Sequence, residues 1–512
     1  MKRKTAVWMM ILCLTAIGAQ AEEEPAPALY PIRENGLWGY MNRAGETVIE
    51  PQWKTALPFS GDAAFVSMSE IPNPFQQSLG SGHHDGLIDR HGNYIVEPAP
   101  ERIVLEYDTA WRIVDTEADA EGFRDKASGF YQPPLGNFEQ VILSGDGSGP
   151  VAVMDSDGKI GYVSRETGEI VIPFQYTAMG DNTAFYHGYA RPADETVLLN
   201  EYGEAYGWDE KEHLIDSRGN EVTLPDSMVP VSYVKDGYVI YSIPLETEEA
   251  EEERFLDMPG YEDYMPGQRG IGLARLDGTV IIEADPSIAL MSLPDENGLV
   301  CFLKDTHETM LLAGAELPLL LAGHMDMEGH MIVPPTYNTV DWELAAYAFE
   351  NGYAVIEDFS AKPENDMRWV IIDTAGHEIF SRQVYTNDRS FFLDGPVQEN
   401  GLIWYSIAER NTGERCCGLL RIADGQAEYL TDAIYESHAG SVLPVKQQED
   451  FAEGLHPVRQ NGLWGYINEQ AEMVIPPAWD SASSFRDGLA LAEKNGKLMY
   501  IDRSGAVVWE EK

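Results

Sequence analysis

Three short groups of residues in this 512-residue chain carry side chains that could bind a metal ion. His83-His84-Asp85 brings two imidazoles and a carboxylate together. Asp155-Ser-Asp157-Gly158 and Gly145-Asp146-Gly147 resemble fragments of calcium-binding loops, but the closing glutamate of a full loop is missing. Adjacent histidines on a strand point to opposite faces, which makes them poor chelators. We therefore interpret all three groups as surface loops or turns and predict no metal site.

Catalytic chemistry has no signature in this chain either. It contains no Gly-x-Ser-x-Gly elbow, no phosphate-binding loop and no His-Glu-x-x-His motif. Short polar residues do recur where a strand should meet a turn, and there they cap turns through local hydrogen bonds. These corner residues are Asn42, Asp89, Asp216, Asp373, Asn468 and Asp502. With 85 acidic residues in the chain, they give no support for a glycosidase-like carboxylate pair. We predict no catalytic residues and no cofactor.

The overall charge restricts the partners. The chain has a formal charge of −50, which repels nucleic acid and anionic membranes. The simplest interpretation is a solubilising surface, with attraction of a basic partner or of Ca²⁺ as the alternative. The four cysteines include Cys301 and the adjacent pair Cys416-Cys417, which is too few for a disulfide framework.

The first 21 residues read as a signal peptide. Lys2-Arg3-Lys4 forms a positive head, Thr5 to Gly18 is apolar, and Ala19-Gln-Ala21 provides small residues for cleavage. No later stretch is long and apolar enough for a spanning helix. We therefore expect an exported protein, placed in the periplasm, at the cell surface or in the medium, with no membrane span after cleavage.

The rest of the chain is organised by a repeat. Residues 33–53 and 459–479 are identical at 13 of 21 positions, and both contain Asn-Gly-Leu-Trp-Gly-Tyr followed by Val-Ile-x-Pro and a tryptophan. Alternating apolar residues, a glycine at the turn and a second Val-Ile strand are typical of a β-hairpin. Degenerate copies of this hairpin recur along the chain, which predicts about ten units. The structural repeat positions are Trp38, Gly39, Tyr40, Gly161, Tyr162, Gly272, Gly323, Trp369, Trp464, Gly465 and Tyr466. The 75-residue interval between Gly86 and Gly161 has room for an eleventh, eroded unit.

Packing explains the repeated residue types. A large aromatic once per unit can bury a face against the neighbouring unit, so Trp38 and Trp464 are predicted to be core residues. The glycine that follows would leave bare backbone for an aromatic of that neighbour. Prolines in Val-Ile-Pro-Pro, such as Pro334 and Pro476, are predicted to end a strand.

This pattern resembles the repeat of bacterial WG-repeat proteins. The resemblance is specific at residues 30–66 and 451–494 and weaker at 151–190, 323–356 and 486–508, where parts of the motif are replaced. It implies an exported or surface β-repeat protein and supplies no catalytic residues.

The sequence therefore predicts an all-β fold, a tandem β-repeat array with a propeller-like arrangement. A solenoid of stacked hairpins is the alternative. The expected divisions are a signal peptide (1–21), an acidic linker (22–29), repeats (30–244), an acidic insertion loop (245–268) and further repeats (269–509). Two propellers of about five units each, parting near 245–290, would satisfy the count.

Two functions follow from this organisation. The first is a non-catalytic binding or scaffold module for a protein, a peptide or a cell-envelope glycan. The alternative is a hydrolase whose site is assembled from loops between repeats, namely 67–85, 112–150 and 245–268. Convergence of these loops on one deep pocket would favour the hydrolase.

Overall fold

The computed structural model describes residues 27–70, 82–134, 138–199, 205–225, 228–244, 269–312, 315–339, 348–359, 367–386, 388–436 and 451–512. The predicted signal peptide, most of the acidic linker and the whole insertion 245–268 lie outside these ranges. Every regular element within them is a β-strand. Consequently, no helix in this part of the chain has the length and apolarity needed to cross a membrane.

The strands form ten antiparallel sheets, most of which follow chain order. The largest has nine strands and consists of two successive units joined through one short strand, so the described residues build eleven units. We number the units from the N-terminus.

Units 1 to 4 are regular meanders. Unit 1 is β1 (Tyr30–Glu34), β2 (Leu37–Met41) and β3 (Thr47–Trp53), which correspond to the second, third and fourth strands of the four-stranded units, because Trp38 pairs with Trp53 as Trp464 pairs with Trp479. Unit 2 is β4 (Thr55–Ala56), β5 (Ala63–Ser67), β6 (Asp85–Asp89) and β7 (Tyr94–Val96). Unit 3 is β8 (Arg102–Glu106), β9 (Ala110–Asp115), β10 (Ala120–Asp125) and β11 (Tyr131–Gln132). Unit 4 is β12 (Gln140–Ile142), β13 (Val151–Met154), β14 (Ile160–Val163) and β15 (Ile170–Tyr176).

Units 5 to 8 follow, and the longest strands lie in units 5 and 7. Unit 5 is β16 (Ala178–Tyr186), β17 (Tyr189–Leu199), β18 (Ala205–Glu212) and β19 (Ile215–Asp216). Unit 6 is β20 (Val229–Pro230), β21 (Tyr238–Pro244), β22 (Arg269–Arg275) and β23 (Val280–Asp285). Unit 7 is β24 (Ile288–Met291), β25 (Leu299–Leu312), β26 (Ala315–Asp326) and β27 (Met331–Thr339). Unit 8 is β28 (Tyr353–Asp358), β29 (Arg368–Asp373) and β30 (Glu378–Gln383).

Units 9 to 11 complete the chain. Unit 9 is β31 (Tyr385–Thr386), β32 (Arg389–Asp394), β33 (Leu402–Glu409), β34 (Arg415–Ala423) and β35 (Gln426–Tyr429). Unit 10 is β36 (Tyr435–Glu436), β37 (Leu455–Gln460), β38 (Leu463–Asn468) and β39 (Met473–Trp479). Unit 11 is β40 (Ser481–Ala482), β41 (Leu489–Lys494), β42 (Lys497–Asp502) and β43 (Val507–Glu510).

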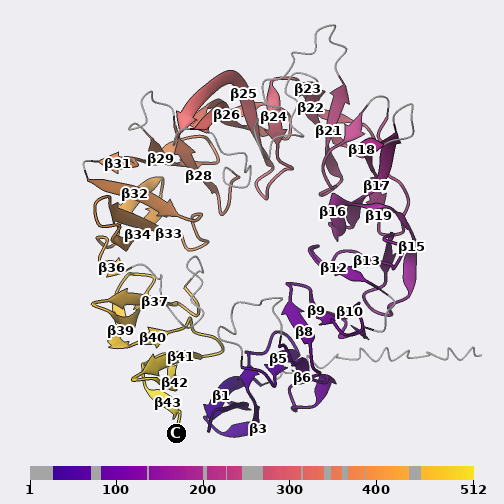
Figure 1. Ribbon diagram of the computed structural model, residues 1–512. Coiled ribbons are helices and arrows are strands. Elements are labelled where there is room, and N and C mark those ends of the chain that lie inside the picture. Colours follow the sequence, from indigo (N-terminus) through magenta and orange to yellow (C-terminus); the bar gives the residue numbers. More distant parts are fainter. Residues whose placement is uncertain are drawn as a thin grey trace, which may run out of the picture.

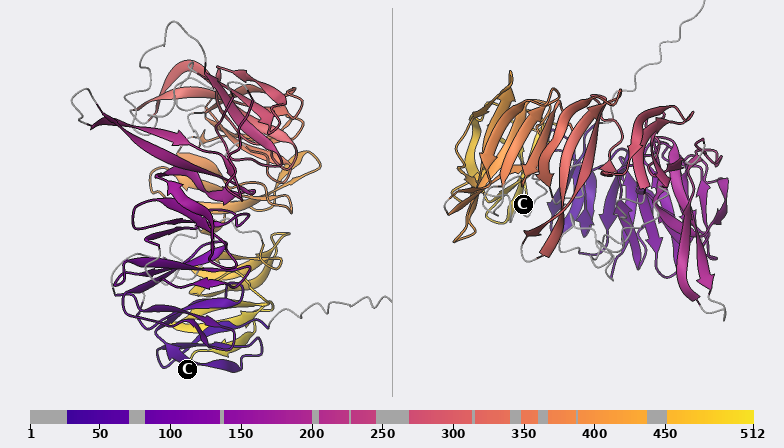
Figure 2. Two further views of the ribbon diagram at one scale, coloured as in Figure 1. Left: turned by 90° about the vertical axis from the view of Figure 1, so that its right-hand side faces the viewer. Right: turned by 90° about the horizontal axis from the view of Figure 1, so that it is seen from above.

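The units are arranged in a ring, with a first strand such as β12 toward the centre and a fourth strand such as β15 at the periphery (Figure 1). Seen edge-on, the yellow C-terminal units lie beside the indigo N-terminal units (Figure 2). This arrangement confirms the propeller-like prediction, and the solenoid alternative is wrong.

Each pair of neighbouring units shares one buried apolar cluster, because both faces of every sheet are apolar. Between units 6 and 7, for example, Ile240 and Leu273 pack with Val300 and Phe302. The core therefore continues past the predicted boundary near 245–290. The expected division into two propellers is wrong, and residues 30–244 and 269–509 are two arcs of one ring.

The ring closes between unit 11 and unit 1. Tyr30, Ile32 and Met41 of unit 1 share a buried cluster with Tyr500 and Trp509 of unit 11. In addition, Arg33 donates two hydrogen bonds to Glu511, from Nε at 2.6 Å and from Nη2 at 3.0 Å. The two ends of the chain are thus joined by the same kind of apolar contact that joins successive units.

The fourth strands explain the Val-Ile-x-Pro segment. In β3, β15 and β39 the Ile is buried while the two residues before it are exposed. The prolines lie inside these strands rather than at their ends, since β27 and β39 continue through Pro334-Pro335 and Pro476-Pro477. The register of β38 and β39 shifts there, between Trp464 and Tyr466, and a proline is tolerated at such a bulge because no ladder donor is needed. The prediction that these prolines end the strand is wrong.

Unit 3 is the eleventh unit in the long interval before Gly161. Its third strand places Gly122 where Gly39 and Gly465 stand in their units, and in each case the glycine faces backbone of the fourth strand. The repeat motif could not be recognised in the sequence of unit 3, because Glu121 occupies the position of the repeat tryptophan. The expected count of about ten units is therefore one short.

Candidate functional site

The repeated tyrosines join each unit to the next. Tyr40 and Tyr466 are fully buried and donate to the carbonyl oxygens of Leu57 and Ser483 in the following unit, both at 2.8 Å. Tyr162 makes the same bond to Thr183 at 2.9 Å. Burial raises the pKa of Tyr40, Tyr162 and Tyr466, so all three remain protonated donors. These residues hold the ring together and are not reactive groups.

The tryptophans occupy related but unequal positions. Trp464 is buried at 2% exposure and faces Trp479 across the third and fourth strands of unit 10. Trp38 and Trp369 are half-buried, and the indole of Trp369 donates to the Phe391 carbonyl at 3.1 Å. The structure thus places Trp464 in the core and the other two at its edge.

The repeat glycines face their own sheet. A Cβ on Gly465 would lie 2.5 Å from the Ile475 carbonyl oxygen of the same unit, and one on Gly161 would lie 3.0 Å from the Ile172 carbonyl oxygen. At Gly272 and Gly323 the ring of Tyr241 or Phe302, directly across the same sheet, also obstructs a side chain, and at Gly272 the Ile282 carbonyl oxygen is nearer still, at 2.5 Å. The expected contact with an aromatic of the neighbouring unit is therefore wrong. A side chain at this position would collide either with the backbone of the bulged fourth strand or with an aromatic side chain on the second strand.

The polar corner residues cap turns, as predicted. The carboxylate or amide oxygen accepts the backbone N–H groups two and four residues later, for example His91 and Asn93 at Asp89 and Ala375 and His377 at Asp373. Burial acts to raise the pKa of Asp373, but the hydrogen bonds from His377 outweigh it and the pKa lies below its ordinary range. These carboxylates are already engaged by the backbone.

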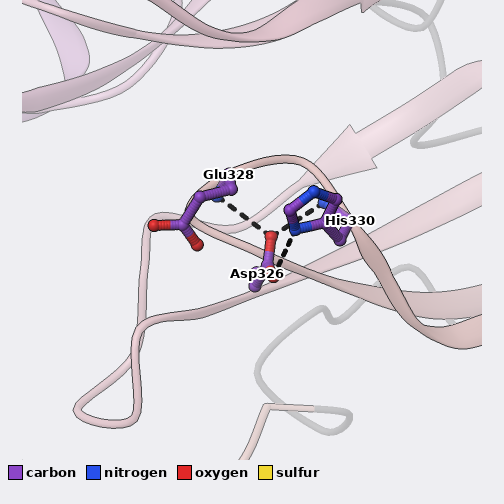
Figure 3. Close-up of side chains that lie close together, drawn as sticks. All are labelled: Asp326, Glu328 and His330. Atoms are coloured by element: carbon purple, nitrogen blue, oxygen red, sulfur yellow. Dashed lines mark hydrogen bonds and ion pairs between the residues drawn. The ribbon is translucent and has the colours of Figure 1, made fainter.

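One corner also brings three metal-binding side chains together. The ligand atoms of Asp326, Glu328 and His330 all lie within 4.8 Å of one another (Figure 3). Asp326 accepts the N–H groups of Glu328 and His330 and also lies 3.0 Å from the His330 ring. Asp373 and His377 repeat this arrangement at 3.1 Å in unit 8. The trio is therefore a form of the repeated turn, and its geometry alone does not indicate a metal.

The motifs singled out in the sequence have structural roles. Asp85 is buried in β6, where Oδ2 accepts the Val104 N–H of unit 3 at 3.3 Å and lies 3.0 Å from His83 Nδ1. Asp155 caps a turn through the N–H groups of Asp157 and Lys159. Among the described residues, none of these groups supplies three metal ligands close together.

Three cysteines lie in the described part of the chain. Cys301, Cys416 and Cys417 are free, as expected, with Cys417 buried and Cys416 half-buried. Burial raises the pKa of Cys417 to about 11 and raises that of Cys301 as well. Both thiols therefore stay protonated at neutral pH.

A polar hollow of about 600 Å³ lies between units 3 and 4. Turns of both units form it, and its charged lining consists of Asp108, Asp125, Lys126, Asp146, Arg165 and Glu166. We call this the unit 3/4 hollow. None of these side chains was predicted as a site residue, because they come from four separate turns of two units, at 108, 125–126, 146 and 165–166. Two of them carried a local signal, since Asp125 occupies the corner position of its unit and Asp146 lies in Gly145-Asp146-Gly147, which the sequence indicated as a turn.

An ion pair between the buried Asp125 and the half-buried Arg165 holds the base of the unit 3/4 hollow. Arg165 Nη1 lies 3.0 Å from Asp125 Oδ2, and Arg165 Nε donates to the Gly149 carbonyl at 2.8 Å. Asp125 Oδ1 also accepts the N–H of Ser128 at 2.8 Å. These two charged groups are therefore occupied, and they position the exposed rim formed by Asp108, Asp146 and Glu166.

Asp146 links the unit 3/4 hollow to a group of aromatic rings. Its Oδ2 accepts the His187 N–H at 2.7 Å. The ring of His187 stacks on Tyr233 at 5.7 Å, and Tyr186 stacks on Tyr233 at 5.5 Å. Burial acts to raise the pKa of Asp146, but hydrogen bonds from Ser148 and His187 outweigh it and keep the group anionic. Carboxylates and aromatic faces thus lie side by side at the junction of units 4, 5 and 6.

Comparison of folds gives distant neighbours. One solved structure, titled as a eukaryotic initiation factor, is 11% identical with a TM-score of 0.41 and covers 88% of this chain and 96% of its own. BamB from Moraxella catarrhalis is 9% identical with a TM-score of 0.24 and covers 88% and 94%. Oligogalacturonate lyase from Vibrio parahaemolyticus is 10% identical with a TM-score of 0.27 and covers 55% and 79%. No curated protein matches the sequence.

One protein-family model matches three segments of this chain. The model described as "WG containing repeat" matches residues 38–70, 160–191 and 464–497. Each match begins at the third strand of a unit, in β2, β14 or β38, and extends at least as far as the second strand of the next unit. The sequence repeat therefore spans the joint between two units, and its tyrosine makes the hydrogen bond across that joint. The motif, its matches and the strands they build thus show WG repeats at three places in this chain.

Proposed function

We propose that this WG-repeat protein is an exported, non-catalytic binding module. Its ligand is a protein, a peptide or a cell-envelope glycan that binds on the ring face carrying the unit 3/4 hollow. The observation that carries the proposal is the arrangement of this hollow. Its buried charges pair with each other, while carboxylates remain exposed at the rim beside the Tyr186–Tyr233 stack.

The chemistry of the rim favours a glycan as the first ligand to test. Carboxylates accept hydrogen bonds from hydroxyl groups, and aromatic faces pack against apolar patches of a ligand. Asp125 and Arg165 already pair with each other. This ion pair therefore makes the hollow rigid and does not donate or accept a proton. This binding requires no cofactor, and a rise of the melting temperature in millimolar Ca²⁺ would show that a resident ion was overlooked.

A hydrolase built from loops remains the alternative. One of the three expected loops, residues 112–150, consists largely of β9 to β12 and their turns, so its description as an irregular loop is wrong. The central part of the first loop and the whole of 245–268 lie outside the described residues. Turnover of a bound glycan or peptide would favour this alternative.

Binding to fractionated envelope glycans and to peptide pools tests the proposal. We expect Asp108→Asn and Glu166→Gln to weaken binding by about fivefold each, because each removes one rim carboxylate. Tyr233→Ala removes the shared ring of the aromatic group and should weaken a glycan more than a peptide. Glu50→Gln, an exposed change on β3 far from the hollow, is the control.

Two results would contradict the proposal. One is that no envelope fraction, protein or peptide binds the mature chain. The other is that a ligand binds but Asp108→Asn, Glu166→Gln and Tyr233→Ala leave its affinity unchanged.

A further inference from the structure

A second hollow, of about 360 Å³, lies between units 6 and 7. Its base is apolar and consists of Ile282, Ile288, Phe302 and Met325, all of which are buried. Met331, which is 48% exposed, also lines it. We call this the unit 6/7 hollow. It lies in the size range of small-ligand pockets and is separate from the unit 3/4 hollow.

The walls of this hollow come from two adjacent units. The fourth strand of unit 6, β23, supplies Glu283 and Asp285, and the corner of unit 7 supplies Glu328. The corner is held close to β23, since a Cβ built on Gly329 would lie 3.6 Å from the Ile281 carbonyl oxygen. Gly329 has a φ of +79°, which favours glycine and lets the turn lie flat against the strand.

The lining of the unit 6/7 hollow is mainly negative. The lining includes three carboxylates, those of Glu283, Asp285 and Glu328, and a single ammonium, that of Lys304. The lining therefore has a net charge of −2, on a chain whose total is −50. Carboxylates at the mouth of a pocket with apolar walls attract a cation more strongly than the same groups on a flat surface.

We propose that the unit 6/7 hollow binds an alkylammonium group, meaning an unbranched aliphatic chain that ends in a primary amine. The methylene groups would pack on Ile282, Phe302 and Met325, and the ammonium would lie at Glu283 and Glu328. Long amines are bound in this divided manner, with the apolar stem buried and the charged end among polar groups. A methionine such as Met325 can adjust to a flexible chain.

Two sources share this chemistry, a free diamine and a lysine side chain of a protein. Titration of the full mature chain with 1,5-diaminopentane probes the first. Titration with a lysine-containing peptide and its lysine-acetylated form probes the second. Pentan-1-ol, which has the same stem without the charge, and Ca²⁺, which has the charge without the stem, are the ligand controls.

Three variants test the site, because one should weaken diamine binding, one should strengthen it and one should leave it unchanged. We expect Glu328→Gln to weaken diamine binding by about fivefold, because it removes one carboxylate from the rim. Lys304→Met should strengthen it, because it removes the only repelling charge of the lining. Glu50→Gln, an equal change of charge on the exposed face of β3, should leave it unchanged. Added salt should weaken the binding to the unaltered chain.

Each outcome of these titrations either supports the proposal or overturns it. Binding of the diamine alone or of the lysine peptide alone supports the proposal and identifies the source. Binding of neither overturns it, as does an equal loss with Glu328→Gln and Glu50→Gln, which would indicate non-specific attraction. Weaker binding in Lys304→Met would show that the site prefers an anion, and Ca²⁺ binding lost with Glu328→Gln but no amine binding would show a metal site instead.

Discussion

The closure of the ring can be tested with one hydroxyl group. Tyr500 occupies the repeat tyrosine position of unit 11, and its OH donates to the Pro31 carbonyl oxygen of unit 1 at 3.0 Å. Tyr466 makes the equivalent bond inside the chain, to Ser483 at 2.8 Å. Both tyrosines are buried, at 4% and 0% exposure. Tyr500→Phe and Tyr466→Phe therefore remove the same bond at the closing joint and at an ordinary joint.

The expected cost follows from the environment of each bond. A buried hydrogen bond contributes about 0.5–1.5 kcal/mol net, and a carbonyl left buried without a donor costs about 1–3 kcal/mol. Each substitution keeps the ring of the side chain and creates almost no cavity. We therefore expect both variants to lose roughly 1–2 kcal/mol of unfolding free energy, with similar values for the two.

Urea unfolding, followed by circular dichroism and tryptophan fluorescence, measures the effect as the change in midpoint multiplied by the slope. If the ring is closed, the two variants shift together. A clear shift for Tyr466→Phe with none for Tyr500→Phe would show that units 1 and 11 are not joined. No shift for either would refute the role assigned to the repeat tyrosine.

Three further predictions concern the joints. Trp464→Ala should lower the free energy of unfolding by about 3–5 kcal/mol, because it empties a buried position, and unchanged unfolding curves would contradict its place in the core. Glu121→Ala should cost about 3 kcal/mol, because Glu121 accepts from Arg112 at 2.8 Å and from the Val141 N–H of the next unit at 2.7 Å. An effect no larger than that of the exposed change Glu50→Ala would count against it. Burial acts to raise the pKa of Glu511, but the hydrogen bond from Arg33 outweighs it and the pKa lies below its ordinary value. The stability from this group is thus present above the unfolded-state pKa of about 4.3 and is lost as the pH falls through the folded-state pKa. The stability difference between the unaltered chain and Glu511→Gln should shrink on acidification from pH 6 to pH 3, and a constant difference would contradict the pairing.

Sequence reasoning identified the parts of the unit that depend on local residue type. The hairpin of third and fourth strands, the capped corners and the once-per-unit aromatic all follow from short-range patterns such as Trp464-Gly-Tyr and Asn468. The first strands were harder, because β4 and β40 have two residues each and carry no periodicity. Unit 3 was obscured by Glu121, whose carboxylate takes the place of an apolar ring.

Long-range relations were not encoded in any local pattern. The division near 245–290 was inferred from the number of units, whereas the packing of Leu273 on Val300 continues across it. The role of Gly39 was misjudged because the bulge that it faces forms only when β3 pairs with β2. The two hollows combine turns of different units, so their residues share no spacing in the sequence.

Closure of the eleven units into one ring is the central claim, and a zero-length cross-link tests it most directly. Lys512 Nζ lies 3.2 Å from Glu34 Oε1, across the joint of units 11 and 1. Lys497 Nζ lies 3.8 Å from Glu510 Oε1 within unit 11 and serves as the internal control. After carbodiimide treatment of the dilute monomer, mass spectrometry should find both the Lys512–Glu34 and the Lys497–Glu510 links. Recovery of the Lys497–Glu510 link without the Lys512–Glu34 link would contradict the closed ring.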